Sequence, residues 1–461
     1  RYWQSYWRAI RKVNMFLENI PTAAVRNEAT RSRMMAEAKI LRAYYYLLLV
    51  KWYGDLPIIH DVPALESDFV EYPKQPAWKV LQACVEDCEE TLDNNEVPWR
   101  IANLSERNRM TRGTACAIIS QASLFAASKL YCHGENLWKY AYDKNKKVYD
   151  LLVANGFKLY TELQDDHYNS AYAELFVGSP GYPVECERIM VGRPEAPNQP
   201  NYWVWGMPIQ NNYRAGTVPT QELVDCFDVL STGKNVLDYY QPYLDEQHLK
   251  PNFNPDSGYA LTKSTDEEGN VTYRETAPFS NRDLRFEAVC IHNGSTVYVG
   301  DARSTVTTYE GGNCELRDNA RTHTRTGYYN NKFRQWYSCA DKRSGDGAWV
   351  YFRFAEVMLN FAEAAVEQND LPTAMRLINE VRHRAGFAPE VDLDPKGDQE
   401  LARLMLRKER RTEFVFEEHR YFDNRRWTAN NENIECEKFT TGMKVKRSGL
   451  RYSYERFVVG S

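Results

Sequence analysis

The chain has 461 residues, of which 43% are hydrophobic and 26% are charged, and 58 Lys and Arg residues against 63 Asp and Glu residues give a net charge of −5. This composition is typical of a globular protein, and without a clustered basic surface it excludes proteins that bind nucleic acids through their phosphates. The longest apolar run, residues 43–50, is far shorter than the roughly 20 residues that cross a bilayer.

Residues 1–155 are predicted to form helices. From Met34 to Trp52, apolar residues recur every three or four positions until Gly54 and Pro57 end the pattern. The same spacing predicts four more helices, over residues 2–17, 80–92, 113–131 and 138–153.

Residues 156–348 are richer in Pro, Gly, Asn and Asp, and helical periodicity fades there. One β-hairpin is predicted, with strands over 286–291 and 296–299 joined by the turn dipeptide Asn293-Gly294. A long irregular insertion in a compact protein is usually functional, so we expect the ligand-binding region in this part of the chain.

Residues 349–428 are again predicted to be helical. One apolar stripe covers 350–365, and a second covers 374–385, with Pro372 in its first turn and Gly386 just past its end. A third helix is predicted over 399–418. The remaining residues, 429–461, are expected to form a C-terminal tail packed on the scaffold.

Charged residues of both signs alternate over 407–413. At this spacing they can pair within one helix. Pairing with Glu37, Lys39 or Arg42 of the long helix near the N-terminus is the other structural role that we expect for them.

Aromatic residues make up 13% of the chain, with 31 Tyr, 19 Phe and 11 Trp. Such an excess of Tyr and Trp indicates thick helix packing, a binding surface, or both. The ten cysteines are scattered and form neither a disulfide framework nor a metal knuckle, so most are expected to be buried. Cys314 and Cys339 are the best candidates for a bridge.

The sequence lacks the known catalytic and metal-binding motifs. The eight histidines lack metal-ligand spacing, and neither a G-x-S-x-G motif nor a Walker loop occurs. Residues 231–234 match S-x-x-K without its companion motifs and are interpreted as a turn. Asp266, Glu267, Glu268 and Asn270 lack the order of a calcium loop and are interpreted as a solvated loop, with calcium binding as the alternative. We therefore predict no enzymatic activity, no metal and no cofactor.

Several short sequence blocks, spread over nearly the whole chain, resemble blocks of one protein family. They read AEAKILRAYYY at 36–46, YGDLP at 53–57, PTQELVDCF at 219–227, NRDLR at 281–285, TGYY at 326–329, FRFAEV at 352–357, NFAEA at 360–364, INEVR at 378–382, and ERR, HRYFD and RRW between 409 and 427. In this order they resemble the SusD/RagB family, surface lipoproteins that capture nutrients for TonB-dependent transporters of Bacteroidetes.

The resemblance implies a mostly α-helical fold in a single SusD-like domain. Its scaffold would be four tetratricopeptide-like helix pairs, with a long irregular loop-rich insertion that contains a small β-hairpin. It further implies a lipid anchor ahead of the present N-terminus, a location on the outer membrane facing the cell surface, and a SusC-like TonB-dependent transporter as the partner. The family's shared blocks belong to the scaffold, so they do not identify the ligand.

Candidate ligand-binding residues therefore come from side-chain chemistry. Pyranose rings stack on Trp and Tyr, while Asn, Gln and Arg bond their hydroxyls. Two groups in the loop-rich region meet this requirement: Tyr202, Trp203, Trp205, Asn211, Asn212, Tyr213 and Arg214 form the first, and Trp336 and Tyr337, with Trp349 nearby, form the second. The alternative role of these rings is to pack the loops on the scaffold.

We therefore expect a non-enzymatic protein that captures oligosaccharides or polysaccharides at the cell surface and delivers them to the transporter. A peptide receptor of RagB type is the alternative, because Asn211, Asn212 and Arg214 also suit a peptide backbone. An α-helical glycosidase or lyase, and a helical scaffold that binds only protein, are further hypotheses. A ligand-binding test on glycans and peptides separates them.

Overall fold

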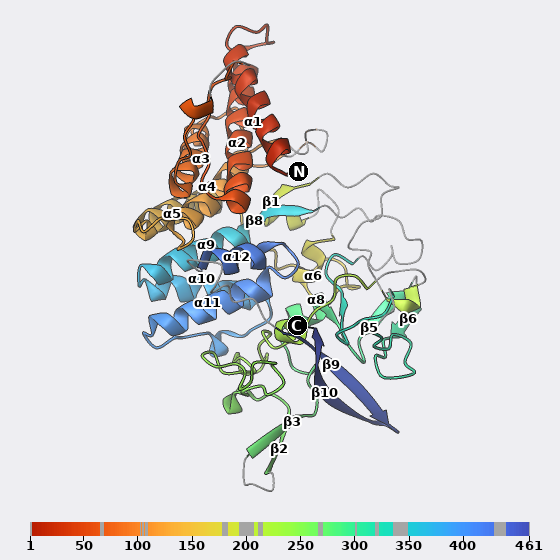
Figure 1. The fold of residues 1–461 in the computed structure, drawn as a ribbon. Coiled ribbons are helices and arrows are strands. Elements are labelled where there is room, and N and C mark those ends of the chain that lie inside the picture. Colours follow the sequence, from red (N-terminus) through yellow and green to blue (C-terminus); the bar gives the residue numbers. More distant parts are fainter. Residues whose placement is uncertain are drawn as a thin grey trace.

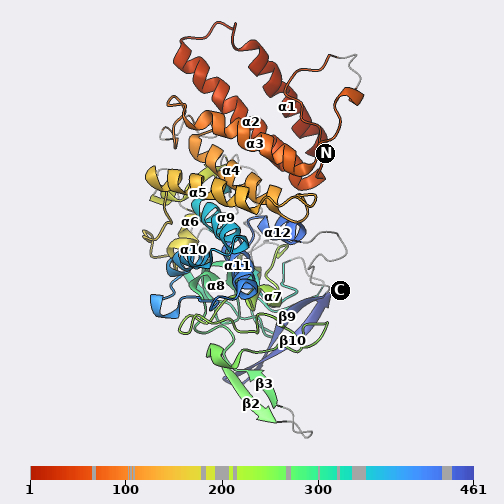
Figure 2. The same cartoon turned by 90° about the vertical axis from the view of Figure 1, so that its left-hand side faces the viewer.

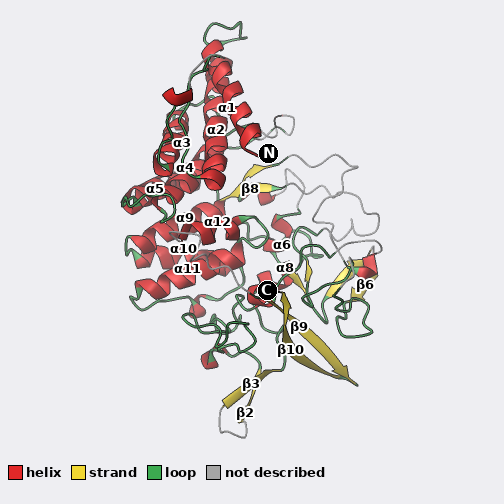
Figure 3. Cartoon of the chain, viewed as in Figure 1, coloured by secondary structure: helices red, strands yellow, loops and turns green. Residues whose placement is uncertain are grey.

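The structure is a computed structural model of the chain. It describes residues 2–64, 69–101, 103, 106, 109–177, 183–192, 207–210, 215–265, 271–299, 302–318, 322–334, 349–427 and 439–460. Helices occupy one side of the molecule, and loops with short strands occupy the other (Figures 1 and 3).

Five helices build the N-terminal part, and the sequence predicts all of them. They are α1 (Tyr2–Asn19), α2 (Glu28–Tyr53), α3 (Ala77–Leu92), α4 (Arg112–Ala127) and α5 (Trp138–Ala154). Each packs against the next, so they form a stack of antiparallel neighbours (Figure 2). Local signals set the ends: Asn27 accepts a hydrogen bond from the Thr30 N–H at the start of α2, and Gly54, with φ of 74°, ends that helix. Helix α4 ends earlier than predicted because Ser128 is extended, with ψ of 146°.

Four helices continue the stack in the C-terminal part. They are α9 (Phe354–Glu367), α10 (Leu371–Arg384), α11 (Gln399–Glu413) and α12 (His419–Trp427). Helix α9 packs against α4 and α5, so residues of both halves share one hydrophobic core. Within the described residues, no helix has both the length and the apolar character that crossing a membrane requires.

Two boundaries in this part differ from the prediction. The segment Val350–Arg353 forms strand β8, paired with β1 (Arg188–Val191), instead of the first turn of α9. Helix α11 ends at Glu413 instead of residue 418, because Phe416 and Glu418 adopt positive φ angles of 59° and 63° that break the helix.

Among its described residues, the loop-rich part carries three short α-helices and several two-stranded sheets. The helices are α6 (Ala171–Leu175), α7 (Gln221–Val224) and α8 (Leu284–Val289). The sheets pair β2 (Leu261–Thr265) with β3 (Val271–Glu275), β4 (Cys290–Ile291) with β7 (Tyr329–Asn330), and β5 (Thr296–Val299) with β6 (Ala302–Thr305).

The predicted hairpin between residues 286 and 299 is wrong. The strand over Thr296–Val299 exists, but it pairs with β6, and β4 pairs with β7. Most of the other predicted strand is helix α8, which Asp283 starts by accepting a hydrogen bond from the Arg285 N–H. The apolar residues of this run, Phe286, Ala288, Val289, Cys290 and Ile291, are all buried, and a short apolar run does not distinguish a strand from a buried helix.

A C-terminal hairpin completes the fold. Strands β9 (Thr440–Ser448) and β10 (Arg451–Gly460) pair antiparallel along their whole length. The hairpin contacts α7, and the Met443 N–H donates a hydrogen bond of 2.8 Å to the carbonyl oxygen of Thr326. Arg456 also bonds Asp225 and Glu275 of the loop-rich part, at distances of 2.6 and 3.0 Å.

Candidate functional site

A depression lined by several aromatic rings lies where α11 turns into α12. It has a volume of about 420 Å³, within the size range of small-molecule sites, roughly 300–1,000 Å³. We call it the aromatic cleft and define it by the following lining residues: Phe333, Trp349, Phe414, Phe416, Tyr421 and Trp427, with Arg411, Glu418, His419 and Arg420 among the polar ones.

The rings of the cleft come from three distant segments. Phe333 follows β7, and its ring centroid lies 5.4 Å from that of Trp349, just before β8. Trp427 ends α12, where its indole N–H donates a 2.7 Å hydrogen bond to Glu363 of α9. Tyr421 remains 54% exposed at the edge of the cleft. Ring faces and polar side chains therefore meet on one concave surface.

Three residues that line this cleft have a strained backbone. Phe333, Phe416 and Glu418 all have φ between 59° and 65°, a region that bulky side chains rarely enter. Each such residue costs on the order of 1–3 kcal/mol, and residues of this kind cluster at functional sites. The surrounding structure must hold them in place.

A buried ion network provides that hold. Glu413, just before the strained turn, and Glu417, within it, both bond Arg353 of β8, with Nε to Glu417 at 2.7 Å and Nη1 to Glu413 at 2.5 Å. Lys332 adds a 2.7 Å bond to Glu417, and Arg285 adds one of 2.8 Å to Glu413. Burial alone would raise the pKa of Glu417, but Arg353 and Lys332 hold it below its ordinary value.

The ion-pair partners of residues 407–413 differ from the predicted ones. Lys408 pairs with Asp228, Glu409 with Arg285, and Arg410 with Asp423. Their expected partners on α2 are engaged elsewhere: Glu37 pairs with Arg33 and Arg109, Lys39 with Glu90, and Arg42 with Asp87. The charges of α11 thus tie the helix to the loop-rich part.

One wall of the cleft contains His419, which lies close to the buried Glu356 of α9. The His419 ring stacks on Phe414 with centroids 4.5 Å apart, and its Nε2 lies 4.0 Å from a carboxylate oxygen of Glu356. Burial lowers the pKa of His419 to about 3 and raises the pKa of Glu356 to about 7. Near neutral pH the histidine is therefore uncharged, and the carboxyl group is partly protonated.

Comparison with known families decides the identity of this fold. The family described as the SusD family matches residues 190–456, more than half of the chain. A second family, described as starch-binding and associating with the outer membrane, matches residues 1–124. The chain belongs to the SusD family. This is a family of binding proteins rather than enzymes, as the sequence predicts.

Solved structures agree with this assignment. A SusD-like protein from Bacteroides fragilis is 25% identical, with a TM-score of 0.73 over 99% of this chain and 79% of its own. A SusD-like carbohydrate-binding protein from the same species is 20% identical, with a TM-score of 0.66 over 100% of this chain and 81% of its own. A surface glycan-binding protein from Bacteroides uniformis is 19% identical, with a TM-score of 0.53 over 92% and 73%. Among curated proteins, a search finds no significant match.

The predicted ligand residues of this SusD-family chain lie outside the described residues. This holds for Tyr202, Trp203, Trp205, Asn211, Asn212, Tyr213 and Arg214, for Trp336 and Tyr337, and for the acidic residues 266–268. The anchor points of two of these segments are joined, because the Gly192 N–H donates a 2.6 Å hydrogen bond to the carbonyl oxygen of Trp349. Cys314 carries a buried free thiol, and its suggested partner, Cys339, is also outside the described residues.

Most of the cleft was missed by sequence reasoning. Of its rings, Trp349 alone was named as a site candidate, beside Trp336 and Tyr337. Tyr421 and Trp427 belong to blocks that resemble the SusD family and were interpreted as scaffold. Phe333 and Phe416 carry no signal, because their role follows from positive φ angles that spacing does not reveal.

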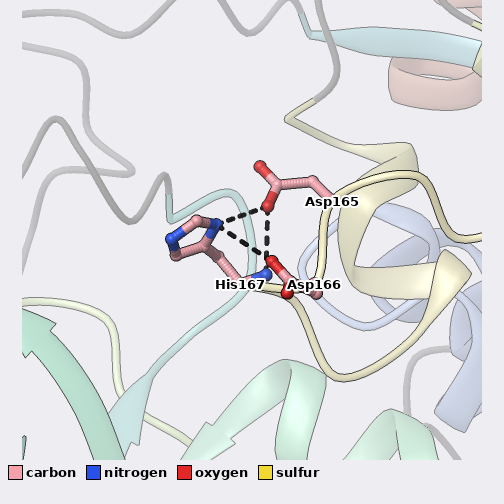
Figure 4. A group of neighbouring side chains, drawn as sticks. All are labelled: Asp165, Asp166 and His167. Atoms are coloured by element: carbon pink, nitrogen blue, oxygen red, sulfur yellow. Dashed lines mark hydrogen bonds and ion pairs between the residues drawn. The ribbon is translucent and has the colours of Figure 1, made fainter.

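A second cavity lies beside a group of three potential metal ligands. Asp165, Asp166 and His167 converge (Figure 4), with His167 Nδ1 2.6 Å from Asp165 and 3.6 Å from Asp166. Asp166 is fully exposed, and His167 already bonds Asp165, so this geometry equally suits a solvated turn. The adjoining cavity measures about 130 Å³ and is smaller than typical ligand sites.

Proposed function

We propose that this SusD-family chain is a carbohydrate-binding protein of the cell surface, associated with the outer membrane, and that the aromatic cleft holds its ligand. The observation that carries the proposal is the cleft itself, where strained aromatic residues line a ligand-sized depression. The family's description as starch-binding and the carbohydrate-binding relatives support the ligand class.

The side chains of the cleft suit sugars chemically. The apolar C–H faces of pyranose rings stack on Trp, Tyr and Phe. Glu418 is exposed at the rim and offers acceptors to hydroxyl groups. Because the ion network fixes the turn before ligand arrives, binding does not incur the cost of ordering it.

Calorimetric titration with intact glycans tests the proposal. The panel contains starch, xylan, mannan, β-glucan and pectin, with a tryptic digest of casein as the peptide arm. We expect one glycan to bind the wild-type protein and Trp349→Ala to lose most of that affinity. Trp78→Ala is the matched control, because Trp78 is also half-buried but lies on α3. Binding of peptides alone would replace the glycan with a peptide ligand.

The same experiment also tests the predicted ligand residues that lie outside the described residues. A double variant, Trp203→Ala with Trp205→Ala, tests whether the first predicted group contributes to the ligand site. A loss of affinity in a folded double variant would support this contribution, and unchanged affinity would leave the cleft as the site.

We also propose that the bound glycan passes to a TonB-dependent transporter and that a lipid anchor holds the protein at the cell surface. Family membership and the description of the second family motivate this part. Purification from native membranes in mild detergent tests it, since a co-purifying transporter barrel is expected. Recovery of the protein alone, under conditions where other membrane complexes survive, would contradict the partnership.

A further inference from the structure

A row of aromatic rings, most of them exposed, leads away from the aromatic cleft. It consists of Tyr421 on α12, Trp52 at the end of α2, and Tyr2 and Tyr6 on the first turns of α1, and we call it the aromatic row. Tyr421 is 54% exposed, Trp52 39% and Tyr2 55%. Helix α1 begins beside the end of α2, and α12 lies next to both (Figures 1 and 2).

The row is continuous with the cleft. Tyr421 lines the cleft, and its ring centroid lies 5.7 Å from that of Trp52. Trp52 is in turn 5.8 Å from Tyr2, and Tyr2 is 5.9 Å from Tyr6. The planes of these last two pairs differ by only 13° and 17°. The rings thus follow one another from the cleft to α1 with similar spacing.

The rings are held in place before any ligand binds. Trp52 packs edge-on against the buried Phe422 at 5.0 Å, and Tyr6 contacts Tyr45 at 5.8 Å. Arg425 donates a 3.2 Å hydrogen bond to the Tyr421 hydroxyl. Rings that are fixed by their neighbours lose little conformational entropy on binding.

The side chains of the aromatic row favour a sugar chain over a protein as its ligand. Among the described residues, both of the tryptophans that count as exposed large hydrophobic side chains lie in this region: Trp52 in the row and Trp3 next to it. Exposed aliphatic side chains such as Val70, Leu244 and Leu450 belong to other segments. A line of Tyr and Trp rings fits the C–H faces of successive sugars better than a mixed protein surface does.

We propose that the aromatic row extends the cleft and holds further units of a polysaccharide chain, so that the preferred ligand is a long glycan rather than a short oligosaccharide. This inference rests on the proposed function, because the cleft must itself bind a glycan. Short fragments occupy the cleft alone, and longer chains gain contacts along Tyr421, Trp52 and Tyr2.

Calorimetry with intact and fragmented glycan tests the inference. The probes are whichever glycan of the panel binds the wild-type protein and its own short enzymatic fragments. The variant Tyr2→Ala with Trp52→Ala should lower affinity for the intact glycan about tenfold, because it removes two ring contacts with the sugar chain. Its affinity for the fragments should stay within error of the wild type. Thermal melting establishes that the variant is folded.

Two further variants keep the test decisive. Tyr2→Ala alone removes an exposed ring at the start of α1 and leaves Trp52 on Phe422, so a smaller loss in the same direction is expected even if the double variant unfolds. Tyr273→Ala is the control, because Tyr273 is 40% exposed on β3, far from the row. It should bind both probes as the wild type does.

The outcomes separate the two proposals. If no glycan of the panel binds the wild-type protein, the proposed function fails and this inference fails with it. If the glycan binds and the row variants keep the wild-type preference for long chains, the inference alone is overturned. It is also overturned if the variants bind glycan normally but lose a membrane protein that co-purifies with the wild type, since the row would then be a protein-docking surface.

Discussion

Arg353 holds Glu417 through two parallel charge-assisted hydrogen bonds, with Nε 2.7 Å from Oε2 and Nη2 2.8 Å from Oε1. The pair joins strand β8 to the strained turn that presents Phe416 and Glu418 to the aromatic cleft. Both side chains are buried, so removing one charge leaves the other without compensation. The same ion pair therefore stabilises both the strained turn and the fold around strand β8.

The first prediction concerns this pair. Arg353→Met should destabilise the protein by about 3–5 kcal/mol, the usual cost of breaking a buried ion pair from one side. Urea unfolding followed by circular dichroism measures the change. Arg376→Met is the control, because the Arg376–Glu380 pair is exposed and should contribute about 0–1 kcal/mol. Equal losses in both variants would show that the network does not stabilise the turn.

The helical half of this fold could be predicted because its signals are local. The apolar spacing from Met34 to Trp52 and the stop at Gly54 mark α2 without knowledge of the rest. Strand β8 could not be separated from α9, since Val350 fits the helical stripe and the pairing partner, β1, is distant in sequence. Long-range pairing overrides local pattern at such boundaries.

The cleft could not be predicted from the sequence either, because it also depends on long-range contacts. Its rings lie in three separate segments, around Phe333, Trp349 and residues 414–427, and only the folded chain brings them together. The partners of Arg410 and Glu413 are likewise long-range, so helical spacing suggested different ones. Aromatic composition correctly indicated a surplus of rings but not which of them line a cleft.

The second prediction concerns pH. The folded-state pKa of His419, about 3, is below its usual value of about 6.5, so its stabilising contribution is present above about pH 6.5 and is lost as the pH falls. Glu356 acts in the opposite sense, because its folded-state pKa of about 7 is raised. Its contribution is present below about pH 4.3 and is lost as the pH rises through 7.

Single variants should expose these opposing effects. His419→Gln should raise the free energy of unfolding at about pH 5 relative to its value at about pH 7. Glu356→Gln should have the opposite effect and favour the protein at about pH 7. Urea midpoints of the three proteins at both pH values provide the measurement. Parallel pH profiles for all three would exclude these two residues as the source of pH dependence.

The third prediction concerns strain at the cleft. Glu418→Gly should raise stability by up to about 1 kcal/mol, since glycine adopts positive φ without steric cost. Glu418→Ala keeps the strained backbone and serves as the control. Thermal melting distinguishes them, and a higher midpoint for the alanine variant than for the glycine variant would refute the strain at this position.

The last prediction concerns Gly327, which joins the loop-rich part to the C-terminal hairpin. Its φ is 89°, and a Cβ atom here would clash with the backbone of Met443 on β9. Gly327→Ala should therefore destabilise the protein by more than the roughly 1–3 kcal/mol of an unfavourable φ alone. Gly294→Ala separates the two effects, because Gly294 has φ of 96° and open space around its Cβ position. Hydrogen exchange should show faster exchange in β9 for Gly327→Ala but not for Gly294→Ala, and equal exchange in the two variants would mean that the close approach to Met443 does not hold the hairpin.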